Sequence, residues 1–219
     1  MPRFDAVLFD LDGVLADTAH IHFAAWRRLG EELGIHLEPA FEEKLKGVDR
    51  MTSLELILAH GRPEGSVTRT AEEKRVLADR KNGYYTAAIA EQTPDDLLPG
   101  ARRVLEEVRD AGLKIALASA SRNAPPLLEQ LGIAPLFDAI ADPAAVKAPK
   151  PAPDLFLEAA RLVGVVPERC LGIEDSVAGI ISIKDAGMVA VGIGDATVLT
   201  RADYVVPSTA LLHIRDFLG

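Results

Sequence analysis

The stretch Ala6-Val-Leu-Phe-Asp-Leu-Asp-Gly-Val14 joins an apolar run to two aspartates and a glycine. Residues 4–9 are apolar at nearly every position rather than at alternate ones, which is typical of a parallel strand buried on both faces. We therefore predict that Asp10 and Asp12 follow the carboxyl end of this strand, where open α/β sheets bind their ligands. Since residues i and i+2 of an extended segment point to the same side, their carboxylates should lie close together. A plainer interpretation is also open, in which Asp10 caps a helix and Asp12-Gly13 forms a turn.

Composition is that of an ordinary globular protein and limits the possible partners. The 219 residues, 48% of them hydrophobic, suffice for one large core or for a core with a smaller inserted domain. The net charge of −9 argues against a nucleic-acid or membrane surface, so an anionic substrate would need a local basic pocket. The single cysteine, Cys170, leaves no intrachain disulfide, and we find neither a secretory signal nor a membrane-spanning run. We expect a cytoplasmic, monomeric enzyme.

The order of patterns along the chain predicts two domains. Strand and helix patterns alternate from about residue 98 onward, whereas helical patterns fill most of the segment between the first strand and that point. Such βαβ alternation is typical of a doubly wound parallel sheet. The predicted fold class is therefore α/β, a Rossmann-like parallel-sheet core at residues 1–15 and 95–219 with an α-helical cap domain at 16–94. The two linkers would allow the cap to close over a site between the domains.

Local signals give more detailed expectations. Asp17 or Thr18 is predicted to cap the first helix, which should end near Gly34. Residues 61–66 form a predicted surface connection. Residues 208–218 are predicted to form a closing helix.

Polar residues follow other predicted strands as well. Ser119-Ala-Ser121 stands between a strand and a helix, where hydroxyls and backbone N–H groups can bind an anion. Lys150 lies in a stiff proline-rich loop, and Glu174-Asp175 offer oxygen ligands suited to Mg²⁺. Taken singly, these residues could equally be a helix cap, a solvated lysine and acids at a helix N-terminus. Together they predict one polar site at one edge of the sheet.

A resemblance to the haloacid dehalogenase superfamily of phosphotransferases is carried by four motifs in order, namely Asp10-Leu-Asp-Gly-Val14, Ser119, Lys150-Pro151 and Glu174-Asp175. The resemblance implies that Asp10 is a nucleophile that accepts a phosphoryl group and that Asp12 is the general acid and base. It implies that Ser119 and Lys150 bind the transferring phosphoryl group. One Mg²⁺ would be held by the Asp10 carboxylate, the Asp12 backbone carbonyl and Asp175, with Glu174 nearby.

Within that superfamily, the cap resembles the β-phosphoglucomutase family in residues 18–26, 46–50 and 80–82, as do residues 119–123 of the core. The resemblance implies that His22 orients Asp12 and that Arg50 clamps the distal, non-transferring phosphate, a task suited to its planar fork of donors. Arg122 stands where some relatives carry lysine, and Pro149 where relatives often have a small residue. The implied substrate site comprises Lys46, Gly47, Arg50, Lys81, Ser119, Ala120, Ser121, Arg122, Asn123 and Lys150.

The resemblance therefore implies an Mg²⁺-dependent mutase that interconverts β-glucose 1-phosphate and glucose 6-phosphate. The reaction would pass through an aspartyl-phosphate and a bisphosphate, with glucose 1,6-bisphosphate as the activating donor. Two alternatives are a sugar-phosphate phosphatase on the same fold and a catalytically silent phosphosugar-binding protein. His22 could also be an ordinary interface histidine, and Arg50 could lie on a solvated helix face.

Overall fold

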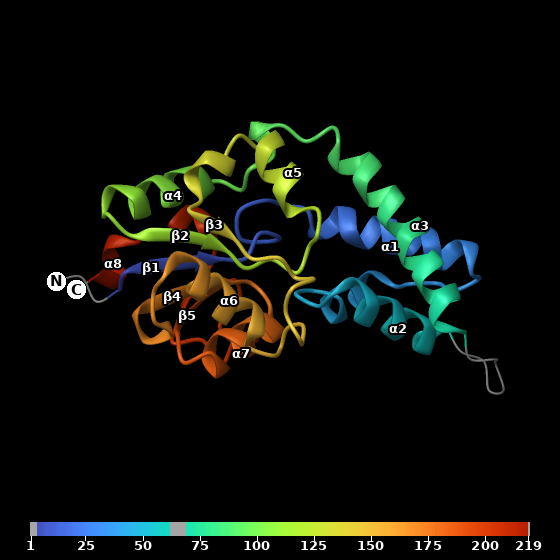
Figure 1. The fold of residues 1–219 in the computed structure, drawn as a ribbon. Helices are drawn as coiled ribbons and strands as arrows, with labels where there is room; N and C mark the ends of the chain where they lie inside the picture. Colours follow the sequence, from blue (N-terminus) through green and yellow to red (C-terminus); the bar gives the residue numbers. More distant parts are fainter. Residues whose placement is uncertain (1–3, 62–68, 219) are drawn as a thin grey trace.

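The computed structural model describes residues 4–61 and 69–218, and its centre is a parallel sheet (Figure 1). Among these residues the sheet has six strands in the order β3-β2-β1-β4-β5-β6, which is the order of a doubly wound Rossmann fold. The predicted fold class is confirmed. The strands are β1 (Ala6–Phe9), β2 (Lys114–Leu117), β3 (Ala139–Ile140), β4 (Cys170–Glu174), β5 (Val189–Ile193) and β6 (Tyr204–Val206).

Helices cover both faces of the sheet and bury β1 at its centre. Val7 and Phe9 face a hydrophobic cluster with α4 (Ala101–Asp110) and α5 (Ala124–Gln130). Alternate residues of the same strand, Ala6 and Leu8, face a second cluster with α6 (Asp154–Val163) and α7 (Val177–Asp185). Figure 1 shows these helix pairs on opposite sides of the strands. Burial on both faces explains why residues 6–9 are continuously apolar.

Three further helices lie beyond the carboxyl ends of the strands, at the other end of the molecule (Figure 1). They are α1 (Ala19–Glu32), α2 (Arg50–His60) and α3 (Ala71–Ile89), with a 3-10 helix at Pro39–Lys44. Their apolar faces form a separate cluster that includes Trp26, Leu54 and Ile57. The predicted division into a core and a cap at residues 16–94 stays a prediction, which this separate cluster supports.

The end of the chain differs from the predicted single helix over 208–218. The structure has a 3-10 turn at Thr209–Leu211 and a separate short helix, α8 (Arg215–Leu218). Leu212 is extended between the two, because Arg103 donates to the carbonyl oxygens of Ala210 and Leu212. Those carbonyls accept from a side chain instead of from a continuing helix.

The expectations for the cap at Thr18 and for the loop at residues 61–66 have different outcomes. Thr18 occupies the N-cap position of α1, but its side chain makes no cap hydrogen bond and instead donates to Asp12. The predicted surface connection at 61–66 lies outside the described residues, apart from Gly61.

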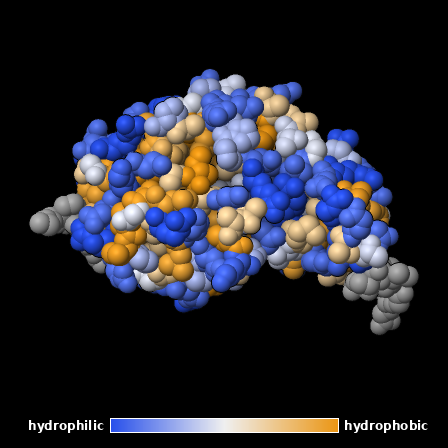
Figure 2. Space-filling view, viewed as in Figure 1, coloured by the Kyte–Doolittle hydropathy of each residue, from blue (hydrophilic) through white to orange (hydrophobic). Residues whose placement is uncertain are grey.

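The surface mixes hydrophilic and hydrophobic side chains. On the face shown in Figure 2, hydrophobic side chains lie mainly over the half that carries the sheet, while much of the cap presents hydrophilic ones. Among the described residues, none of the helices has the length and apolar character needed to cross a bilayer.

Candidate active site

The polar residues predicted to meet at the sheet edge do come together there. Asp10 follows β1, Ser119 follows β2 and Glu174 ends β4, and all three are buried. Lys150 comes from the loop before α6, and its Nζ donates to Asp10 Oδ1 and Glu174 Oε2, each at 2.7 Å. The lysine is therefore not the solvated loop residue of the plainer interpretation, since it is buried between two carboxylates.

The carboxylates at this edge carry more negative charge than one lysine can balance. Asp10, Glu174 and Asp175 offer ligand oxygens that all lie within 4.8 Å of one another. Burial and the Glu174 charge raise the pKa of Asp10 to about 8, although Lys150 acts to lower it. Burial, Glu174 and Asp10 together raise the pKa of Asp175 well above its ordinary value. Three carboxylates against one ammonium leave a site that suits a divalent cation.

Both oxygens of the Glu174 carboxylate accept hydrogen bonds from groups of the protein itself. Burial would raise its pKa, but the Lys150 charge and hydrogen bonds outweigh burial and lower it. Its Oε1 accepts from the Ser176 hydroxyl at 2.8 Å and from the Asp175 and Ser176 amides at 3.1 and 3.0 Å, while Oε2 accepts from Lys150. Asp10 and Asp175 therefore have more free oxygen capacity for a metal than Glu174 has.

Gly13 is required where the loop after β1 meets this cluster. Its φ is +76°, and a Cβ at that position would lie 2.1 Å from Asp175 Oδ2. Only glycine fits such a conformation without strain. The glycine of the opening motif thus leaves room for the Asp175 carboxylate beside Asp10.

Asp12 faces the cap side of the site. Its carboxylate accepts from the Thr18 hydroxyl and lies 3.9 Å from His22 Nε2. Burial raises the pKa of Asp12, although the Thr18 hydrogen bond and the Lys150 charge oppose the shift. A raised pKa brings the carboxyl group closer to giving and taking a proton near neutral pH, which suits general acid and base chemistry.

His22 is held between cap residues that keep its ring neutral. Its ring stacks on Tyr85 with centroids 3.8 Å apart, and its Nδ1 lies 2.8 Å from Lys81 Nζ. Burial and the charges of Lys81 and Arg50 lower the pKa of His22 well below its usual value. Donation from a Lys81 ammonium to Nδ1 would place the ring hydrogen on Nε2, the atom that faces Asp12.

Lys81 itself is a buried cation. Its Nζ lies 4.7 Å from the Trp26 ring centroid and 5.0 Å from that of Tyr85. Burial and the nearby Arg50 lower the pKa of Lys81 to about 7. The predicted stretch 80–82 therefore places a lysine in the site rather than on a solvated helix face.

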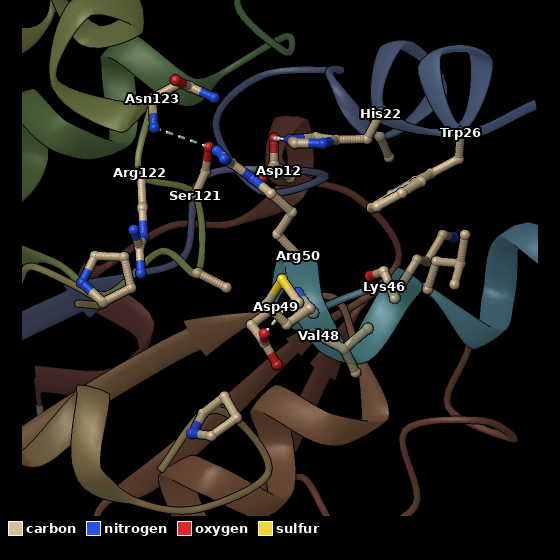
Figure 3. A pocket seen from close by; sticks show the side chains of 18 of the residues that line it. Asp12, His22, Trp26, Lys46, Val48, Asp49, Arg50, Ser121, Arg122 and Asn123 are labelled. Atoms are coloured by element: carbon tan, nitrogen blue, oxygen red, sulfur yellow. Dashed lines mark hydrogen bonds and ion pairs between the residues drawn. The ribbon is translucent and has the colours of Figure 1, made fainter. Parts of the chain in front are cut away.

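A cavity of about 520 Å³ separates the cap helices from the sheet edge. Asp10 and Asp175 line it from the core, while Lys46, Gly47 and Arg50 come from the start of α2 and the turn before it. Figure 3 shows Lys46 and Arg50 at this part of the cap. Ser119, Lys150 and Glu174 are not among its lining residues and lie buried next to Asp10. The other predicted site residues that line the cavity are Asp12, His22, Lys81, Ala120, Ser121, Arg122 and Asn123.

The basic end of this cavity is formed by two arginines. Arg50 extends from the start of α2 toward Ser121 and Asn123 (Figure 3). Its side chain is 25% exposed, and burial together with the Arg122 charge lowers its pKa. Two arginines that line one cavity and lie close enough to influence each other's charge offer a site for an anion.

Three residues of the site were not predicted as site residues from the sequence. Thr18, which the sequence suggested as a helix cap, binds Asp12. Tyr85 is fully buried, and its hydroxyl has no hydrogen-bond partner among the described residues. Asn82 accepts from Arg50. Tyr85 lies one helical turn after Lys81, so the spacing of α3 could have indicated it.

Comparisons with known proteins agree with this arrangement. The family model "haloacid dehalogenase-like hydrolase" matches residues 4–187. A β-phosphoglucomutase of Bacillus subtilis is 47% identical over 209 residues, covering 95% of this chain and 92% of the relative. A phosphorylated carbohydrates phosphatase of Thermotoga maritima is 31% identical, over 84% of this chain and 82% of the relative. A crystal structure of β-phosphoglucomutase from Clostridium difficile aligns with a TM-score of 0.93 and 44% identity, over 97% and 95% of the two chains.

Proposed function

The chain belongs to the haloacid dehalogenase-like hydrolase family and, within it, to the β-phosphoglucomutase family, and from this premise we propose the reaction that its site performs. The enzyme interconverts β-glucose 1-phosphate and glucose 6-phosphate. A phosphoryl group passes through Asp10, and glucose 1,6-bisphosphate is the activating donor and the intermediate.

The observation that carries this proposal is that the cavity has two unlike ends. Asp10 and Asp175 lie at the core end, and Arg50 and Arg122 lie near the other. A sugar bisphosphate needs one phosphate at the nucleophile and a second phosphate held away from it. The basic end supplies the second site, which hydrolysis of a simple monophosphate does not require.

The residues divide the reaction into two displacements. An oxygen of Asp10 attacks the phosphorus of the bisphosphate, the bond from phosphorus to the sugar oxygen breaks, and Asp12 donates its proton to that oxygen. In the second step a hydroxyl of the hexose phosphate attacks the aspartyl-phosphate, gives its proton to the Asp12 carboxylate and releases Asp10. Within one turnover, the bisphosphate formed in this way must reorient so that its other phosphate faces Asp10 and is transferred back to it.

Charge neutralisation accounts for the remaining residues. Lys150 and Ser119 would stabilise the transferring phosphoryl oxygens. Mg²⁺ held by Asp10, Asp175, the Asp12 carbonyl and, more weakly, Glu174 would supply further positive charge to the phosphoryl oxygens. A cap closed over the site would keep water from the aspartyl-phosphate. We also propose that the enzyme is a monomer of the cytoplasm, where hexose phosphates are made and used.

A phosphatase acting on sugar phosphates is the second candidate. The T. maritima relative, named a phosphorylated carbohydrates phosphatase, favours it. Asp10 and Asp12 would serve both reactions, so the cap decides between them. Substitution of Arg50→Ala should impair a mutase severely because its bisphosphate must bind in two orientations, whereas a phosphatase for small monophosphates should lose much less.

The deciding experiment supplies the purified protein with Mg²⁺, β-glucose 1-phosphate and a catalytic amount of glucose 1,6-bisphosphate. We expect glucose 6-phosphate to accumulate with little inorganic phosphate. Release of inorganic phosphate without glucose 6-phosphate would replace the mutase proposal with the phosphatase.

A further inference from the structure

One amide oxygen joins the two sides of the cavity. Asn82 Oδ1, on α3 of the cap, accepts from Arg50 Nη2 at 2.7 Å and from Asn123 Nδ2 at 2.9 Å. Arg50 begins α2 of the cap, while Asn123 is the N-cap residue of α5 in the core. A carbonyl oxygen has two lone pairs, so this one acceptor can serve both donors at once.

The two donors held in this way are those that face the basic end of the cavity. Arg50 and Asn123 both line the cavity, whereas Asn82 does not. The guanidinium of Arg50 has five N–H donors and the amide of Asn123 has two. Each therefore gives one donor to Asn82 and keeps others for an anion in the cavity.

The choice of an amide at position 82 follows from charge. Arg50 already has a carboxylate within reach, since its Nη1 lies 3.8 Å from Asp79 Oδ1. A second carboxylate on the same face of α3 would neutralise the guanidinium and compete with a phosphate for it. The neutral oxygen of Asn82 orients the guanidinium without removing its charge.

We propose that Asn82 is a positioning residue that holds Arg50 of the cap and Asn123 of the core at a fixed separation, so that both donate to the distal phosphate. This inference rests on the proposed function, in which a second phosphate occupies the basic end. The bridge also fixes the span between that end and Asp10. A mutase needs this span to be constant, because its intermediate binds once in each direction.

The test compares Asn82→Ala and Asn82→Asp with wild type on two substrates. One substrate is β-glucose 1-phosphate with glucose 1,6-bisphosphate, which uses the distal site. The other is acetyl phosphate, which can phosphorylate Asp10 but carries no second phosphate. Thr86→Ala is the matched control, since Thr86 lies one turn later on α3 and its hydroxyl donates to the Gly83 carbonyl.

We expect Asn82→Ala to lower kcat/KM for the hexose phosphate by about tenfold or more, and for acetyl phosphate by a much smaller factor. Asn82→Asp should keep an acceptor for both donors but raise KM for the hexose phosphate further, because its carboxylate competes with the phosphate. Thr86→Ala should stay within about twofold of wild type on both substrates, because the Thr86 hydroxyl donates within its own helix.

Equal losses on both substrates would show that Asn82 merely supports the fold, and an Asn82→Ala enzyme that matches Thr86→Ala would also overturn the inference. So would an Asn82→Asp enzyme with the wild-type KM. Failure of the proposed function would give a different result, because wild type itself would then release inorganic phosphate and form no glucose 6-phosphate. In that case the effect of each substitution on kcat/KM can still be compared between the two substrates, by measuring their hydrolysis.

Discussion

At the scale of single residues, the site depends on Lys150. It is buried between Asp10 and Glu174, and its ammonium contacts the carboxylate of Asp10, the proposed nucleophile. Its own burial opposes its charge, yet the two carboxylates outweigh burial and raise its pKa. The lysine therefore stays charged, holds the pKa of Glu174 down and opposes the upward shift of the Asp10 pKa.

Substitution of Lys150→Met should lower the rate of phosphoryl transfer by about a hundredfold to a thousandfold, as loss of one charge-stabilising donor does elsewhere. Leaving two buried carboxylates unpaired should also destabilise the fold by about 3 kcal/mol or more. Steady-state kinetics and urea unfolding measure the two effects. Lys147→Met, at an exposed lysine of the same loop, should change neither, and a fully active Lys150→Met enzyme would contradict the assigned role.

The depressed pKa of Lys81 makes stability depend on pH. Burial and Arg50 lower the pKa from 10.5 to about 7 in the folded protein, so between these values the unfolded chain binds more protons. The contribution of Lys81 to the free energy of unfolding therefore rises with pH over this window. Lys81→Met removes this contribution. The stability of the variant should therefore exceed that of wild type most near pH 7, and the difference should shrink toward pH 10.

Thermal unfolding of wild type and Lys81→Met at several pH values checks this expectation. The comparison of two otherwise identical chains cancels the titration of the acids that do not interact with Lys81. Lys147→Met serves again as the exposed control. A stability difference that does not change between pH 7 and 10 would show that the pKa of Lys81 is not lowered in the folded protein.

At the scale of elements, the cap meets the core at Gly47. This residue precedes α2 with a φ of +69°, and a Cβ there would lie 2.1 Å from Ser176 Oγ, at the start of α7. Ser176 in turn binds Glu174. A side chain at position 47 would therefore push the cap away from the metal-binding edge.

Gly47→Ala should reduce mutase turnover by about tenfold or more, because displacing the site by even a small distance misplaces the reacting groups. Gly34→Ala is a closely matched control, since Gly34 has a φ of +71° and open space around its Cβ position. Both variants should lose about 1–2 kcal/mol of stability from backbone strain. Loss of turnover in Gly34→Ala to the same extent would indicate that strain, and not contact with the core, is responsible.

The elements also show what the sequence could and could not predict. The strands, their parallel order and the polar motifs after them follow from local patterns, because burial on both faces produces continuous apolar runs. The break at Leu212 could not be predicted, since it depends on Arg103, which is far away in the sequence. Thr18 does occupy the predicted N-cap position, but its hydroxyl donates to Asp12 six residues earlier, a contact that the helix pattern does not specify. The bridge at Asn82 joins three separate segments and likewise has no local signal.

At the scale of the whole molecule, the charge distribution explains how a protein of net charge −9 could bind an anionic substrate. Its cavity brings the cations Lys46, Arg50 and Arg122 together with an acidic side formed by the carboxylates of Asp10 and Asp175. A divalent cation would balance the acidic side. Binding of that cation should therefore stabilise the folded chain as a whole.

Addition of Mg²⁺ to metal-free protein should raise the thermal unfolding midpoint. The free energy of unfolding should rise by about 2.7 kcal/mol when the free Mg²⁺ concentration is a hundred times its dissociation constant. Asp175→Asn should lose most of this gain, while Asp195→Asn, at an exposed position, should keep it. A midpoint insensitive to Mg²⁺ and to its chelator in the wild type would contradict the metal site.

The central claim is that the phosphoryl group on Asp10 is passed to a sugar rather than to water. The most direct measurement labels the protein with a radioactive phosphoryl group, mixes it with excess β-glucose 1-phosphate in a single turnover, and follows the label. We predict that the label appears first in glucose 1,6-bisphosphate and that little appears in inorganic phosphate. Label that passes mainly to inorganic phosphate, with or without the sugar, would contradict the claim.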